Sequence, residues 1–306
     1  MNIRDLQYVV AVAEEMHFGR AADKCNVSQP ALSGQIRKLE EYLGVALFER
    51  TSRTVQITPI GDKIVAQARQ LIILSDEIVS TAQTAKDPLS GQFRIGMIST
   101  IAPYLSPLIL SSIRRELPDL SLTLMEGLTS DLENRLAIGE LDGAILATVP
   151  RDSNLSDIAL YEEPFRIALP AGHPLADQET IDLDTIAHEE LLLLADGHCL
   201  RDQVLDVCHA NTGMAAANTR EASLGTLLAL VEAGDGITLV PALTGPADIR
   251  GHSTHSAIVM RREASGRAGR IVRLVYRSSF PRTELVDRLA SIIRANVPGN
   301  TVRVIN

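Results

Sequence analysis

Apolar residues recur at helical spacing over the first 47 residues of the chain. The opening helix carries four of them at steps of three or four residues or side by side: Leu6, Val9, Val10 and Ala13. The segment 18–47 then predicts a short helix, a tight connection and a second helix. Ser28 supplies an N-cap hydroxyl for that second helix, and Pro30 lies in its first turn, where a missing N–H costs nothing. The pattern predicts a helix-turn-helix.

The second helix of this pair has one apolar and one polar face. The apolar face carries Leu32, Ile36, Leu39 and Leu43. Candidates for contact with DNA lie at its start and on its polar face: Ser28, Gln29, Pro30, Ser33, Gln35, Arg37 and Lys38. No acidic residue occurs from 28 to 39, which suits contact with phosphates and base edges in a major groove. Taken alone, the pattern fits an ordinary helical hairpin with a solvated face equally well.

The segment FERTSRTVQITPIG, which follows the helix pair, alternates β-branched residues with two arginines. It predicts a short two-stranded wing, from which Arg50 and Arg53 reach the DNA backbone or the minor groove. We therefore assign residues 1–58 to a winged helix-turn-helix DNA-binding domain.

Residues 59–89 are expected to form a linker helix and its end. Apolar residues recur along the helix near heptad spacing: Ile64, Val65, Ala68, Leu71, Ile72, Ile78, Val79 and Ala82. Such a stripe pairs naturally with a second copy of the chain, and packing within one chain is the alternative. The sequence DPLSG at 87–91 then breaks the helix and marks a hinge.

Beyond the hinge, short apolar runs alternate with helical stretches, which is typical of an α/β fold with a largely parallel sheet. The runs that predict strands are FRIGMI, SLTLMEG, GAILAT, FRIALP, LLLLADG, GITLVPAL and LVYR. The late strand LVYR can return the chain to the first group of strands. Residues 90–306 would then divide into lobe I, about 90–162 plus 269–306, and lobe II, about 163–268. A cleft between two such lobes is a natural ligand site.

Composition fits several folded units. The chain has 306 residues, of which 45% are hydrophobic and 22% charged, as in ordinary globular proteins. It has no apolar run of about 18 residues and no apolar core of a signal peptide at its start, so we expect a cytoplasmic protein without membrane contact. The net charge is −9, and residues 1–87 carry 10 Lys+Arg and 11 Asp+Glu of the totals 29 and 38. Binding to DNA must therefore depend on a local basic patch.

Motif, spacing and domain order together resemble the LysR-type transcriptional regulators over essentially the full chain. The stretch AADKCNVSQPALSGQIRKLEEYLGVALFER resembles the signature of that family almost residue for residue. The resemblance implies a periplasmic-binding-protein-like effector domain of two α/β lobes behind the winged helix-turn-helix and linker helix. It also implies a homodimer or homotetramer that binds double-stranded promoter DNA, regulates transcription with RNA polymerase as a partner, and is not an enzyme.

The segment LLLLADGHCLRDQVLDVC, at 191–208, closely resembles the OxyR branch of the family. Its string DGHCLRDQ matches the peroxide-reactive loop of that branch, and a second cysteine follows at the expected separation. The resemblance implies that hydrogen peroxide oxidises Cys199 and that Cys208 resolves the product to a disulfide, which cellular thiol reductants reset. A regulator of the oxidative-stress response would follow.

The residues around Cys199 favour a reactive thiolate. A glycine precedes it and a helical pattern follows, so Cys199 is expected near a helix amino terminus, where the helix dipole stabilises negative charge. Arg201, and His198 if protonated, would add to this stabilisation. A buried structural cysteine is the alternative that the neighbouring residues disfavour.

The spacing of the two cysteines predicts a local rearrangement on oxidation. An unbroken helix from Cys199 to Cys208 would separate their Cα atoms by roughly 13 Å, whereas a disulfide tolerates about 7 Å. A sulfenic acid on Cys199 could be captured by Cys208 only after this segment unwinds. We expect two discrete states, which hold the DNA-binding units at different half-site spacings.

Four further residues are expected to bind or activate peroxide. Thr100 and Thr129 occupy loop and helix-start positions that suit hydroxyl donors, although each alone fits an N-cap or core hydroxyl better. The resemblance also assigns Arg270, as an arginine that assists the reactive cysteine, and Asp202, which lies within the reactive-loop string.

Neither the cysteines nor the histidines of the chain indicate a metal site, and we expect no cofactor. Cys25 suits the core beside two alanines, and His17 suits either a phosphate contact or a helix cap. The cysteines at 199 and 208 lack compact zinc-ligand spacing. Two other functions stay open: a LysR-type regulator that binds a small organic acid or aromatic compound between the lobes, and a cysteine-dependent peroxidase.

Overall fold

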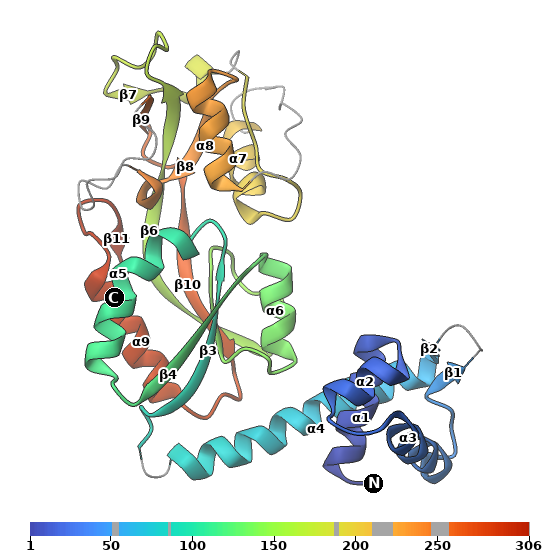
Figure 1. The fold of residues 1–306 in the computed structure, drawn as a ribbon. Coiled ribbons are helices and arrows are strands. Elements are labelled where there is room, and N and C mark those ends of the chain that lie inside the picture. Colours follow the sequence, from blue (N-terminus) through green and yellow to red (C-terminus); the bar gives the residue numbers. More distant parts are fainter. Residues whose placement is uncertain (51–54, 85–86, 187–189, 210–222, 246–256, 306) are drawn as a thin grey trace. The chain divides into compact units, whose positions relative to one another are not determined.

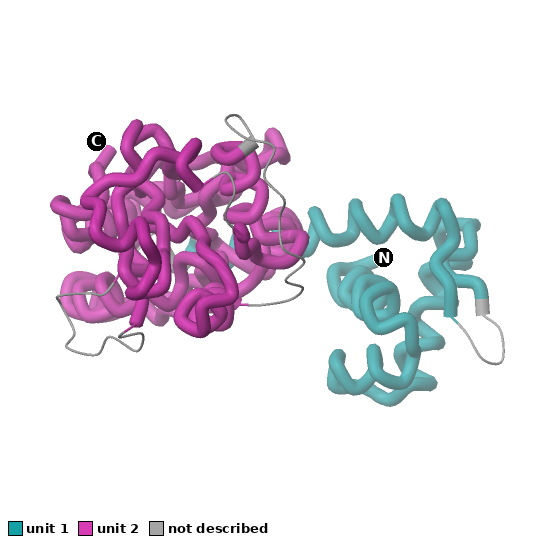
Figure 2. The backbone as a smooth tube through the Cα atoms, turned by 90° about the horizontal axis from the view of Figure 1, so that it is seen from above, with its two compact units in different colours: residues 1–86 teal, residues 87–306 magenta. Residues whose placement is uncertain are grey.

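The chain folds into two compact units, Met1–Lys86 and Asp87–Asn306, as Figures 1 and 2 show. The computed structural model describes residues 1–306 except 51–54, 85–86, 187–189, 210–222, 246–256 and 306. The structure confirms the fold class expected from the sequence, an amino-terminal helix-turn-helix unit and an α/β unit with two cores. The residue bounds of the domains and lobes stay predictions.

Unit 1 contains the expected helices, α1 (Ile3–Glu15), α2 (Phe18–Lys24) and α3 (Gln29–Leu43). Their apolar faces meet in one core, which includes Val9, Ala21 and Leu32. The imidazole Nδ1 of His17 accepts hydrogen bonds from two backbone amides at the start of α2, which makes this residue a helix cap. Cys25 is half-buried against the same core, as expected. Strands β1 (Phe48–Arg50) and β2 (Val55–Ile57) pair antiparallel and form the expected wing.

The linker helix α4 (Pro59–Thr84) has an apolar stripe that is covered along only part of its length. Val65 and Ala68 are buried where α4 packs against α1, and Arg69 Nη1 lies 2.6 Å from Glu14 Oε1 of α1. Farther along, Leu71, Leu74, Ile78 and Val79 are 43–66% exposed. Packing within unit 1 therefore covers only the first part of the stripe.

Unit 2 is built on a sheet with strand order β4-β3-β5-β10-β6-β9-β7. At one end lie three parallel strands, β3 (Gly91–Ile98), β4 (Leu120–Gly127) and β5 (Gly143–Leu146). Helices α5 (Ala102–Glu116) and α9 (Thr283–Asn296) pack together on one side of these strands, and α6 (Thr129–Ala137) lies on the other (Figure 1). The strands β3 to β5 match the predicted runs.

Two long strands connect the lobes. Strand β6 (Leu155–Pro170) leads the chain away from the first core and β10 (Gly269–Arg277) brings it back, so the two pair antiparallel. Strands β8 (Thr238–Pro241), β9 (Ile258–Glu263) and β11 (Arg303–Val304) also run antiparallel to β6, while β7 (Thr180–Ile181) is parallel to β9. The largely parallel sheet predicted from the sequence is therefore wrong: the sheet is mixed, because an outgoing and a returning strand lie side by side.

The second core contains α7 (Cys199–His209), α8 (Leu224–Ala233) and the 3-10 helix η1 (Leu183–Ile186), and η2 (Ala242–Thr244) follows β8. The run LLLLADG is not a strand, contrary to the prediction. Its four leucines are buried, but apart from one bridge between Leu191 and Ile237 the described segment makes no ladder. A loop segment that is buried on all sides has the same continuous apolar sequence as a buried strand, so hydrophobic periodicity cannot distinguish a loop from a strand here.

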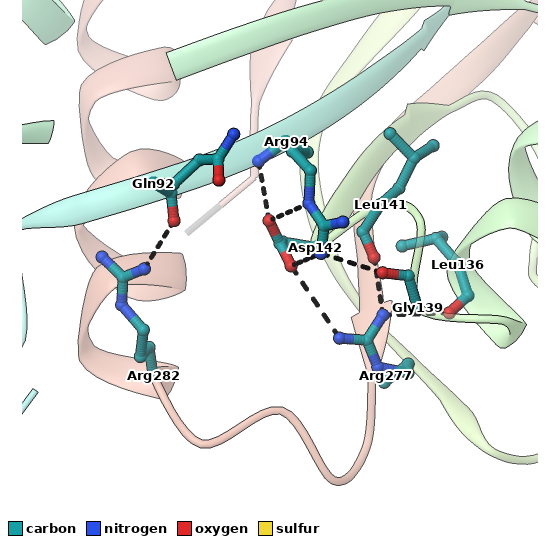
Figure 3. A network of polar contacts seen from close by, with 8 residues as sticks. All are labelled: Gln92, Arg94, Leu136, Gly139, Leu141, Asp142, Arg277 and Arg282. Atoms are coloured by element: carbon teal, nitrogen blue, oxygen red, sulfur yellow. Dashed lines mark hydrogen bonds and ion pairs between the residues drawn. The ribbon is translucent and has the colours of Figure 1, made fainter. Parts of the chain in front are cut away.

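A network of polar contacts ties strands of lobe I to the adjoining loops (Figure 3). Asp142 accepts hydrogen bonds from the backbone N–H of Arg94 at 2.7 Å and from its guanidinium at 2.9 and 3.1 Å. Arg277 Nη1 donates to the backbone oxygens of Leu136 and Leu141, and Arg282 Nη1 donates to that of Gln92. These buried arginines donate to backbone carbonyl groups of β3, of the end of α6 and of the segment before β5, so they tie these segments together.

Candidate functional site

Cys199 is the first residue of α7, as the sequence predicts. Gly197, two residues before it, has φ +96°, a left-handed conformation that residues with a side chain rarely adopt, and this turn directs the chain into the helix. Arg201 of the first turn holds the incoming loop, because its guanidinium lies 2.9 Å from Asp196 Oδ1 and donates to the carbonyl oxygen of Leu194 at 3.0 Å. The loop and the helix start are thereby fixed to each other.

The Cys199 side chain faces a small cavity between the two lobes. The cavity, about 10 Å³, is lined by the end of β3, the start of α6 and the start of α7: Ile98, Ser99, Thr100, Gly127, Leu128, Thr129, Gly197, His198 and Cys199. Although α7 belongs to the second core, Cys199 packs against the first. The cavity has room for one molecule about the size of water.

Hydroxyl groups surround this cavity. Thr129, the first residue of α6, has a fully buried Oγ1 with no hydrogen-bond partner among the described residues. Ser99 Oγ lies 3.5 Å from His198 Nδ1. Sequence reasoning missed Ser99, although its place directly after a predicted strand and beside Thr100 was a usable signal. An unpaired buried hydroxyl costs free energy unless a ligand group bonds to it.

Arg270 supports the cavity from behind without lining it. Its Nη1 donates to Thr100 Oγ1 at 2.9 Å and its Nη2 to the Thr100 carbonyl oxygen at 3.1 Å. Its Nε donates to Glu163 Oε2 at 2.9 Å, in an ion pair whose side chains are 1% and 0% exposed. Glu163 also accepts the N–H of Leu243. Glu163, which the sequence did not reveal, compensates the buried charge that positions Thr100.

The remaining candidates differ in their relation to the cavity. Burial lowers the pKa of His198, so its ring is neutral at pH 7 and acts as a hydrogen-bonding group. Arg201 is engaged by Asp196 and does not line the cavity. Asp202 is exposed in the first turn of α7 and does not line it either. The geometry thus brings together Thr100, Thr129, His198 and Cys199, with Arg270 behind them.

Cys208 is buried in the second core, 1% exposed. Burial raises the pKa of its thiol to about 11, so it is protonated at neutral pH. Helix α7 runs unbroken from Cys199 through Cys208, and no cysteine of the chain is in a disulfide. Gln203, between them, donates from Nε2 to the carbonyl oxygen of Ala147 at 2.8 Å and so joins α7 to lobe I. The structure therefore holds the two thiols apart.

The candidate nucleic-acid interface lies on α3. Ser28 caps this helix, accepting from the N–H of Ala31 at 3.4 Å, and Ser33 is half-buried. The other candidates on the helix are exposed: Gln29, Pro30, Gln35, Arg37 and Lys38. Arg50 ends β1, but its side chain and all of Arg53 lie outside the described residues. The exposed basic and amide groups suit contact with phosphates and bases.

No group of three or more His, Cys, Asp or Glu residues in the described part of the chain could hold a metal ion. Among the helices that the structure describes, none is long and apolar enough to cross a membrane.

Two family profiles cover nearly the whole chain. Residues 3–62 match the bacterial regulatory helix-turn-helix proteins of the lysR family, and residues 86–298 match the LysR substrate binding domain. The chain therefore belongs to the LysR family of transcription regulators.

Relatives of the chain within that family include OxyR proteins and hydrogen peroxide-inducible genes activators. The hydrogen peroxide-inducible genes activator of Pectobacterium carotovorum subsp. carotovorum is 42% identical over 299 residues, which are 98% of each protein. A full-length cysteine-to-aspartate variant of OxyR from Pseudomonas aeruginosa has a TM-score of 0.80 and 35% identity over 99% of this chain and 97% of that one. A cysteine-to-serine variant of Corynebacterium glutamicum OxyR, bound to H2O2, has a TM-score of 0.64 and 36% identity over 96% and 92%. The chain is placed in the OxyR branch, as the string at 196–203 indicated.

Proposed function

We propose that the protein is a DNA-binding transcription regulator switched by hydrogen peroxide through Cys199 and Cys208. The Cys199 thiolate attacks one peroxide oxygen; the O–O bond breaks, hydroxide leaves and a sulfenic acid forms. The Cys208 sulfur then attacks the Cys199 sulfur, the S–O bond breaks, and water leaves as the disulfide forms. Peroxide is the oxidant in this sequence, and a cellular dithiol returns the two electrons on reset.

The single observation that carries this proposal is the cavity at Cys199, with its unpartnered Thr129 hydroxyl. Its volume of about 10 Å³ suits a molecule little larger than water, whereas sites for drug-sized organic ligands run from roughly 300 to 1,000 Å³. The hydroxyls of Thr100 and Thr129 can orient both peroxide oxygens and donate to the leaving hydroxide. Arg270 acts through Thr100 as a positioning residue. This favours peroxide over an organic acid as the effector.

Formation of the disulfide requires α7 to change. Its continuous helix keeps the cysteines too far apart, and Cys208 must leave the second core to reach Cys199. Unwinding also breaks the bond from Gln203 to Ala147, which joins α7 to lobe I. The oxidised state is thus a second packing of lobe II, and the change reaches the contacts between subunits.

The DNA-binding helix and the linker helix are suited to convert this change in the effector domain into a change in transcription. Helix α3 presents its polar residues to the major groove of promoter DNA, and the exposed stripe on α4 pairs with a second copy in a homodimer or tetramer. The protein acts in the cytoplasm, engages RNA polymerase at the promoter, and gives footprints of different half-site spacing in its reduced and oxidised forms.

The deciding experiment is a peptide-level mass map of cysteine state after the reduced protein meets one equivalent of hydrogen peroxide, with thiols blocked at short times. We expect a disulfide between Cys199 and Cys208, and a sulfenic acid on Cys199 in the Cys208→Ser variant. Two free thiols after peroxide would overturn the proposal. Signalling that persists in Cys199→Ser would instead support the regulator of a small organic ligand.

A further inference from the structure

A second, much larger hollow lies on unit 2, formed by strands β6, β9, β10 and β11 and the turns beside them. This groove has a volume of about 660 Å³. Five arginines line it: Arg166, Arg262, Arg267, Arg270 and Arg303. We refer to it as the arginine groove. Apart from Glu162, the charged residues of its wall are all basic, whereas the chain as a whole is acidic, with a net charge of −9.

Two of these arginines are held directly opposite each other. Arg166 of β6 and Arg262 of β9 are cross-strand partners in the antiparallel register. Like charges in this arrangement are destabilising. Burial first, and then the charge of Arg262, lower the pKa of Arg166. The fold therefore brings together two cations at a cost that a bound anion would offset.

The carboxylates in and near the groove are already paired or line a neighbouring hollow, and one of them, Glu162, is part of the groove wall. Glu162 pairs with Arg303, Glu163 pairs with Arg270, and Glu263 accepts from Ser265 and from the N–H of Ala268. Asp177 and Glu179 line the adjacent hollow, which Arg166 and Arg262 also border. No carboxylate of the described residues lies within ion-pair distance of the three remaining arginines: Arg166, Arg262 and Arg267.

We propose that the arginine groove binds a small polyanion that carries at least two phosphate or carboxylate groups. Guanidinium groups match both kinds of anion with paired N–H donors, and the volume falls in the usual range for small-molecule sites. Two charged groups on one ligand can bridge Arg166 and Arg262 at once and reach Arg267 in the turn between β9 and β10. The groove and the Cys199 cavity have no lining residue in common, and the Arg270 side chain is turned to Glu163 and Thr100. Binding through Arg166, Arg262 and Arg267 therefore does not depend on the redox function.

Calorimetric titration of the reduced full-length protein tests the site, with inorganic pyrophosphate and citrate as separate probes. We expect saturable binding of at least one probe, and the pair distinguishes a phosphate ligand from a carboxylate ligand. Arg166→Ala and Arg262→Ala should each weaken binding at least tenfold. Arg262→Lys, which keeps the charge and loses the fork, should weaken it several-fold. Arg114→Ala, at an exposed arginine of α5, is the matched control and should leave affinity unchanged.

Thermal unfolding gives a second measure of binding, one that does not depend on the heat released when the probe binds. The probe that binds should raise the Tm of the native sequence, and at the same concentration it should raise the Tm of Arg262→Ala much less. The Tm without probe reports that the variant is folded, because removal of one of two opposed charges should not lower it. Absence of binding by both probes, or equal weakening by Arg114→Ala, would overturn the proposal.

Discussion

Cys199 and Cys208 lie nine residues apart on one continuous helix, α7, with Cys199 in the inter-lobe cavity and Cys208 in the second core. Their Cα atoms are therefore separated by roughly 13 Å along the helix, about twice the span of a disulfide. The reduced fold thus opposes the bond that the proposed switch requires. Oxidation must drive the helix into another conformation, which is how one thiol reaction can alter the whole unit.

The reactivity of Cys208 should depend steeply on pH. Folding favours its neutral thiol, which raises its pKa from 9.0 to about 11, so the thiolate should be scarce at pH 9 and increase toward pH 11. We expect iodoacetamide to modify Cys208 slowly below pH 9 in the folded Cys199→Ser variant, and with a midpoint near 9 in urea. Peptide mass spectrometry separates Cys208 from Cys25. Identical profiles with and without urea would contradict this expectation.

Thr129→Val should slow the oxidation of Cys199. Valine keeps the shape of threonine but removes the buried hydroxyl that has no partner in the described structure. Loss of one positioned donor to a developing oxyanion costs on the order of 100- to 1,000-fold in rate. Stopped-flow oxidation with peroxide measures this change, with Thr123→Val on the exposed face of β4 as control. Equal rates in both variants would exclude Thr129 from peroxide activation.

Glu163→Gln should destabilise the protein markedly. The substitution leaves the buried Arg270 guanidinium without its compensating carboxylate, and such losses cost roughly 3–5 kcal/mol. The neighbouring Glu162→Gln breaks only the exposed pair with Arg303 and should cost less than about 1 kcal/mol. Urea unfolding of both variants tests the difference. Similar losses in the two would show that the buried pair contributes no more than a surface pair.

Leu74→Lys should disrupt the assembly of subunits. Leu74 is 55% exposed on the uncovered part of the α4 stripe, and a lysine there would place charge in the seam between two helices. Sedimentation velocity should show a smaller species than the native protein gives. Asp76→Lys, two residues along and off the stripe, serves as control and should leave the assembly intact. An unchanged sedimentation coefficient for Leu74→Lys would place the interface elsewhere.

Lys38→Ala should weaken binding to promoter DNA nearly uniformly across sequences. If this exposed lysine of α3 contacts phosphate, the slope of log affinity against log salt should fall by about 1. Lys63→Ala, at an exposed lysine of α4, should leave the slope unchanged. Fluorescence anisotropy at several salt concentrations gives both slopes, and a shared change would indicate long-range electrostatics instead of a contact.

The sequence by itself determined the elements whose signals are local. Ser28, Pro30 and the apolar spacing specify α3, and the same kind of evidence predicts the start of α7 at Cys199 and of α6 at Thr129. Caps, first-turn prolines and amphipathic periods act within a few residues, so they can be read along the chain. The strings around Cys199 and in the helix-turn-helix also indicated the family.

Tertiary structure alone decided what depends on residues far apart in the chain. The run at 191–194 has the composition of a strand, yet in the packed chain it makes a single bridge, between Leu191 and Ile237. The mixed sheet follows from the return of β10 beside β6, and the Arg270–Glu163 pair joins residues 107 positions apart. Distant partners of this kind leave no periodic signal, because burial and charge compensation are properties of the packed chain.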